Sequence, residues 1–96
     1  MNIVELRNKT LAARAVKDTA LDAEFKASPL RKYIDKRIQD AADNGEGKLA
    51  LNFYYAKECA RGERYGGPSM AAALRRYQNE GFVAFPERAY IVISWM

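Results

Sequence analysis

The sequence predicts an α+β fold, close to the α/β type, in which two N-terminal helices are followed by the order β-α-β-β. Helix-forming residues at helical spacing fill residues 2–44, whereas apolar and polar side chains alternate over residues 49–55 and again over residues 82–95. A short helix with a serine cap lies between the two alternating stretches. We therefore expect a small three-stranded sheet covered by helices on one face, with a right-handed crossover in its strand–helix–strand unit.

The first helix is expected over residues 2–26, because this stretch is rich in alanine, leucine, lysine, arginine and glutamate. Two apolar rows lie at helical spacing: Val4, Leu11 and Ala15, and Ile3, Leu6 and Ala13. Since alanine buries little area, this apolar stripe is thin, and a break near Asp18 or Thr19 stays open. The helix either packs on its own domain, which we favour, or projects and binds a partner.

The second helix has clear signals at both ends. Ser28 is a suitable N-cap, Pro29 suits the first helical position, and Asn44-Gly45 provides a left-handed C-terminal stop. Its apolar face comprises Leu30, Tyr33, Ile34, Ile38, Ala41 and Ala42. We expect its charged opposite face to be solvated.

A strand is expected over residues 49–55, followed by a polar loop over residues 57–68. The core-facing residues of the strand are Leu49, Leu51, Phe53 and Tyr55. The loop contains three glycines and shows no apolar periodicity. Loops of this length are often functional, so it is a candidate site.

A third helix and a hairpin complete the chain. Ser69 is a suitable cap for a helix over residues 69–80, with Gly81 at the C′ position and Phe82 making the hydrophobic contact that often follows. The buried residues of this helix are expected to be Met70, Ala73, Leu74 and Tyr77. The hairpin strands cover residues 82–85 and 90–95, with Pro86 at the first corner of the turn.

Length and composition limit the class of protein. The 96 residues make a single domain, with an N-terminal helical segment over residues 1–27 and a compact α/β core over residues 28–96. One cysteine excludes an internal disulfide framework, and the absence of histidine removes the commonest general base and zinc ligand. No apolar run is long enough to cross a membrane, and the N-terminus lacks the pattern of a signal peptide.

Six residues form the candidate binding site for an anion, a nucleic acid or a protein partner. They are Lys57, Arg61, Arg64, Tyr65, Arg75 and Arg76. Residues 57–76 carry a local charge of +3 within a chain of net charge +4, and such a surface favours acidic partners. The plainer alternative is a solubilising surface. The turn Gly66-Gly67-Pro68-Ser69 leads into a helix N-terminus that could bind phosphate, although neither phosphate-loop fingerprint is present.

Catalysis is not indicated anywhere in the chain. Cys59 lies near Lys57 and Arg61, but it has no histidine to act as a base. The acidic residues are scattered and form no paired-carboxylate or metal-binding pattern. We expect a protein that is not an enzyme, with no cofactor and no metal.

Trp95 lies one residue before the end of the sequence and has two interpretations. If the last strand is at the edge of the sheet, Trp95 anchors an interface with another chain. If the strand is internal, Trp95 closes the core, which is the interpretation we favour.

Four segments occur together in a known pattern. They are Ala41-Ala42-Asp43-Asn44-Gly45, residues 49–55, Gly81-Phe82-Val83 and Tyr90-Ile91-Val92-Ile93-Ser94-Trp95. In this order, residues 34–95 resemble small uncharacterised proteins of tailed bacteriophages, from which the loop sequence GERYGGPS departs. The resemblance implies a phage setting, as a virion component or an early protein, and it carries over no functional residue.

We therefore expect a small viral protein that acts through protein–protein contacts, as a structural or accessory part of the virion or as a binder of a host factor. The alternative is a nucleic-acid-binding module that uses residues 57–68 and the helix over residues 69–80. Self-association also stays open. The expected location is the host cytoplasm or the virion, without a membrane partner.

Overall fold

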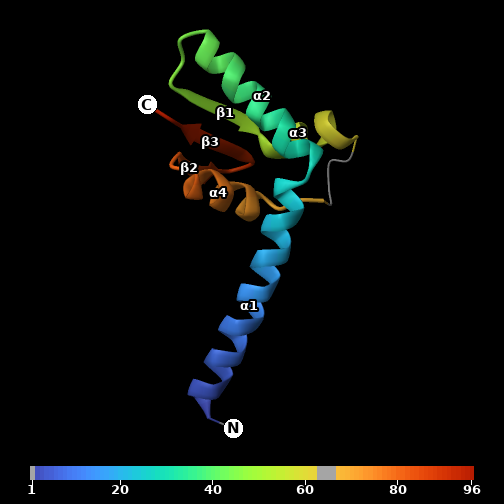
Figure 1. The fold of residues 1–96 in the computed structure, drawn as a ribbon, viewed down its shortest axis with the longest axis vertical. Coiled ribbons are helices and arrows are strands. Elements are labelled where there is room, and N and C mark those ends of the chain that lie inside the picture. Colours follow the sequence, from blue (N-terminus) through green and yellow to red (C-terminus); the bar gives the residue numbers. More distant parts are fainter. Residues whose placement is uncertain (1, 63–66) are drawn as a thin grey trace.

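The computed structural model describes residues 2–62 and 67–96, and its elements confirm the α+β class (Figure 1). In chain order the elements are α1 (Ile3–Lys26), α2 (Pro29–Asp43), β1 (Lys48–Asn52), α3 (Phe53–Arg61), α4 (Met70–Asn79), β2 (Val83–Glu87) and β3 (Tyr90–Ser94). The three strands form a single antiparallel sheet in the order β1-β3-β2. The last strand in the sequence is therefore the central strand of the sheet.

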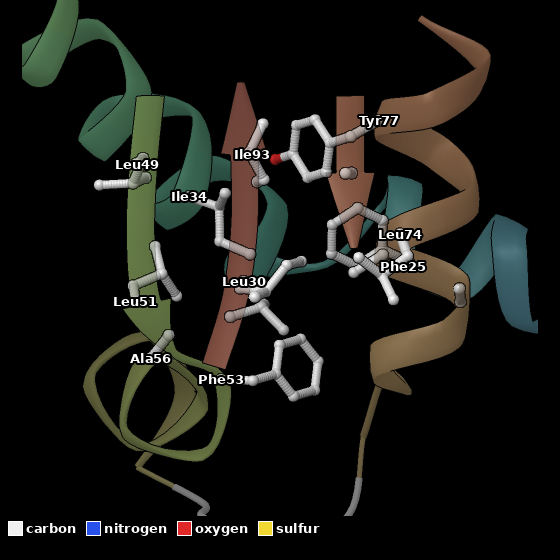
Figure 2. Packing of buried hydrophobic residues seen from close by; sticks show 14 residues of the cluster. Phe25, Leu30, Ile34, Leu49, Leu51, Phe53, Ala56, Leu74, Tyr77 and Ile93 are labelled. Carbon is white, nitrogen blue, oxygen red and sulfur yellow. The ribbon is translucent and has the colours of Figure 1, made fainter. Parts of the chain in front are cut away.

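One face of the sheet is buried, as predicted. In the register of the sheet, Ile93 lies between Leu49 and Ala84, and Leu51 pairs with Ile91. All five side chains are buried. Side chains from α2 and α4, including Leu30, Ile34, Leu74 and Tyr77, pack over this face in one cluster with Phe25 from the end of α1 (Figure 2).

Local capping fixes the ends of the helices where the sequence predicted them. The hydroxyl groups of Ser28 and Ser69 accept hydrogen bonds from the backbone N–H groups of the third helical residues of α2 and α4. After α4, Gly81 takes a φ of 97°, and the N–H of Phe82 donates to the carbonyl of Tyr77 at 3.0 Å. The rings of Phe82 and Tyr77 then meet edge to face, which completes a Schellman motif.

The strand predicted over residues 49–55 is shorter than expected, because Asn52 ends it and caps a new helix. The Asn52 side chain accepts a 3.0 Å hydrogen bond from the N–H of Tyr55, which starts α3. Phe53 and Ala56 then face the core at helical spacing, and Tyr55 is exposed. The first part of the predicted loop is therefore helical through Arg61.

The hairpin turn lies two residues later than predicted. Pro86 is inside β2, which is an edge strand and can therefore lack one backbone donor. Glu87 pairs with Tyr90, so Arg88 and Ala89 form the two-residue connection. Arg88 takes a φ of 57°, which is the left-handed region that a side chain disfavours.

The first helix projects from the domain, which makes the favoured prediction of a docked helix wrong (Figure 1). It is continuous over 24 residues without a break near Asp18, and only Phe25 in its last turn is buried. The radius of gyration is 15.5 Å, against about 12.5 Å for a compact domain of this length. The thin alanine-rich stripe offers too little apolar area to hold the helix against the core.

Candidate functional site

Arg75, one of the predicted binding cations, holds the base of α1 against α4. Its guanidinium donates to Oδ1 of Asp22 at 2.7 and 3.0 Å, and Oδ1 of Asp18 lies 3.7 Å away. The hydrogen bond to Asp22 raises the pKa of Arg75 further above its ordinary range. Because two carboxylates neutralise it, Arg75 has little charge to offer an external anion.

Two further candidates are also engaged within the molecule. Arg76 forms an ion pair with Glu80, one turn further along α4, at 3.5 Å. Lys57 is buried, with its Nζ atom 5.4 Å from the ring centroid of Phe53 and 6.0 Å from that of Tyr54. Arg75, Arg76 and Lys57 therefore each contact groups within the fold.

The other three members of the predicted basic surface lie outside the part of the chain that the structure describes. They are the side chain of Arg61, together with Arg64 and Tyr65. The prediction that they bind an anion, a nucleic acid or a partner stays a prediction.

Trp95 packs on the core from the end of the central strand. Its side chain is half-buried, and its ring lies edge to face with Phe82 at 6.5 Å. Its backbone N–H donates to the carbonyl of Gly47. Because β3 lies between β1 and β2, this strand offers no free edge to another chain. The geometry agrees with the core interpretation, and an interface role for Trp95 stays a prediction.

A polar cluster between α2 and α4 contains the most perturbed group in the described residues. Arg31 bonds both Asp35 and Glu80, at 2.8 and 2.6 Å, and the hydroxyl of Tyr77 donates to Asp35. Burial, followed by this hydrogen bond, raises the pKa of Tyr77 far above its ordinary value. A tyrosine that stays protonated is no general base near neutral pH, so the cluster connects helices and does not support acid–base catalysis.

The outer face of the sheet, opposite the helices, carries an exposed apolar patch. Val83 is 64% exposed, Tyr90 is 48% exposed and Phe85 is 45% exposed. Val92 lies between Ala50 and Phe85 in the middle of this face and is shielded by its neighbours. The alternation over residues 82–95 indicates which of these side chains share a face, but our sequence analysis assigned no role to the outer face of the sheet.

The second uncovered surface is the N-terminal part of α1. Every residue from 2 to 20 is exposed. The large apolar side chains among them are Ile3, Val4, Leu6, Leu11 and Val16. We call residues 3–17 the arm, since Asp18 is the first residue of α1 that forms an ion pair with another described element. One feature of the sequence indicates that the arm is exposed, namely the thinness of its apolar stripe.

Comparisons with known proteins add no assignment. No family model, curated protein or solved structure matches the chain. Among residues 2–62 and 67–96, no helix has both the length and the apolar composition that a membrane crossing requires. No cluster of three or more potential metal ligands occurs in the same residues.

Proposed function

We propose that this chain is a small non-enzymatic protein that acts through protein–protein contacts, in which the α/β core holds the arm out toward a partner. The observation that carries this proposal is the exposure of the arm. It presents Ile3, Leu6 and Leu11 to solvent, although the same helix ends in the fully buried Phe25. The arm, residues 3–17, is close to the length of about 12–15 residues below which an unpacked helix is marginally stable, so a partner that covers its apolar side chains would stabilise it.

The setting we propose is a bacteriophage, with the protein either an accessory part of the particle or a binder of a host factor. This part of the proposal is supported by the resemblance of residues 34–95 to small phage proteins. Nucleic-acid binding through residues 57–68 and α4 is the alternative. It has less support, because Arg75 and Arg76 are paired with carboxylates.

The experiment is an affinity capture from infected cells, with the tag placed after the exposed Met96 so that the arm stays free. The capture is run with and without nuclease, at low and high salt. The double variant Leu6→Ser, Leu11→Ser tests the arm. Val16→Ser is the matched control, because Val16 is the most exposed large apolar residue of α1 yet points away from the side of the helix that lies between Leu6 and Leu11.

We expect a protein partner that survives nuclease, is lost with the double variant and is retained with Val16→Ser. Capture of the same partner by the double variant would contradict the proposal. Recovery of nucleic acid that falls steeply with salt, by a log–log slope of about −0.9 per phosphate contact, would favour the alternative.

A further inference from the structure

We propose that the arm docks on a protein surface that combines an apolar groove with carboxylates along its rim. This inference rests on the proposed function and names the chemistry of the partner. Six side chains on one side of the arm surround an open hollow of about 380 Å³: Ile3, Leu6, Arg7, Thr10, Leu11 and Arg14. Apolar and basic groups therefore share one face, at the spacing with which helices enter grooves.

The arm carries the same net charge as residues 57–76. It carries Arg7, Lys9, Arg14 and Lys17 against Glu5, a net charge of +3, so that residues outside it contribute only +1 to the total of +4. Unlike Arg75 and Arg76, none of these four cations forms an ion pair with any residue that the structure describes. The unpaired positive charge calls for an acidic partner.

The helix dipole does not account for the cations of the arm. The terminal turns of α1 already suit the dipole, with Glu5 in the first turn and Lys26 in the last. Asp18 and Asp22 are paired with Arg75, whereas Arg7 and Arg14 lie beside the hollow without an ion pair to any described residue. An external acidic surface would pair with them.

Three other kinds of partner fit the arm less well than an acidic protein groove does. A second copy of the arm would bring eight cations and two carboxylates together. A nucleic acid would satisfy Arg7 and Arg14 but would leave Ile3, Leu6 and Leu11 against a polyanion. A membrane surface favours a helix with separate apolar and charged faces, and here Arg7 and Arg14 interrupt the apolar face while Val16 lies opposite it.

The test measures binding of the full chain to a defined probe, a synthetic two-helix peptide with a leucine-lined groove between its helices and glutamates along the rim of that groove. The same peptide with glutamine in place of glutamate is the matched probe. A DNA duplex and phosphatidylglycerol vesicles are measured in parallel. Arg7→Glu is compared with Lys9→Glu, because the two variants change the net charge equally on opposite faces of the helix.

We expect the glutamate peptide to bind at least about tenfold more tightly than the glutamine peptide. We also expect Arg7→Glu to weaken binding about tenfold and Lys9→Glu less than about twofold. Equal binding of the two peptides, equal losses in the two variants, or tighter binding to DNA or vesicles would each overturn the inference. In those cases an arm-dependent protein captured from cells would still support the proposed function, so the two failures are distinguishable.

Discussion

Replacing Tyr77 by phenylalanine tests whether one buried hydroxyl joins α2 to α4. The Tyr77 side chain is 0% exposed, and its ring meets Phe25 and Phe82 edge to face at 5.9 and 5.6 Å. Its hydroxyl donates a 2.8 Å hydrogen bond to Asp35, and the Arg31 guanidinium lies 4.9 Å from the ring centroid. The substitution keeps the ring and its contacts, so it removes the hydrogen bond alone.

At neutral pH we expect Tyr77→Phe to lower the free energy of unfolding by about 1 kcal/mol. Hydrogen bonds to charged groups contribute about 1.5–3 kcal/mol when both partners are buried. The side chain of Asp35 is 43% exposed, so water replaces part of the lost bond. The expected cost therefore falls below that range.

The same hydroxyl makes stability depend on alkaline pH. Burial raises the pKa of Tyr77 above its ordinary value of 10.0, so the folded protein keeps a proton that the unfolded chain loses. The contribution of Tyr77 is complete below pH 10.0 and is lost above it, by about 1.4 kcal/mol per pH unit. Tyr77→Phe lacks this loss, so the two stability curves should cross at about pH 11.

Urea unfolding followed by tryptophan fluorescence measures both effects. Trp95 is the single tryptophan and lies against the ring of Phe82, so its emission reports the packing around Tyr77. The difference between the two curves cancels every contribution that the two proteins share. Parallel curves above pH 10 would show that Tyr77 ionises freely, which would refute the buried hydrogen bond.

Two substitutions and one hydrogen-exchange measurement test the local structure. Asn52→Ala should lower the free energy of unfolding by about 1 kcal/mol, because it removes the cap of α3; an unchanged urea midpoint would contradict this. Arg88→Gly should raise the free energy of unfolding by up to about 1 kcal/mol, because glycine adopts the φ of 57° without strain; a lower thermal midpoint would show that the side chain is needed. Amide hydrogens of the arm should exchange far faster in the free protein than those of Ile91 and Ile93. Equal protection would mean that the arm is packed.

Features decided by neighbouring residues could be predicted from the sequence. The caps at Ser28 and Ser69 and the stop at Gly81 depend on contacts three to five residues away, so the residue types alone indicate them. The buried faces of α2 and α4 followed from periodicity for the same reason. Ala42 is exposed although it was expected in the core, because it lies at the margin of the apolar stripe.

The boundary between β1 and α3 could not be read from periodicity. Phe53 suits both a strand that continues the alternation of Leu49 and Leu51 and a helix that buries Ala56. The decision depends on Asn52, whose side chain caps the helix while the N–H of Phe53 donates to the carbonyl of Ala89 in the distant hairpin. That second bond joins residues far apart in the chain, and no local pattern shows it.

The ion pairs of the candidate site could not be predicted for a similar reason. Residues 57–76 look basic as a sequence, but the carboxylate that pairs with Arg75 is Asp22, 53 residues earlier. Charge counted along the chain therefore does not show which cations form ion pairs within the fold. The arm carries a similar net charge, and nothing in the described structure neutralises it.

The two uncovered apolar surfaces differ in how much a partner can bury on them. The outer face of the sheet consists of three five-residue strands, a footprint of about 240 Å² that can be covered from one side only. The arm is a cylinder about 22 Å long and 10 Å wide with about 700 Å² of lateral surface. The half of this surface that carries Leu6 and Leu11 offers about 350 Å², more than the footprint of the sheet face. Phe85→Ser should therefore weaken partner capture much less than the Leu6→Ser, Leu11→Ser variant, and the reverse order would assign binding to the sheet.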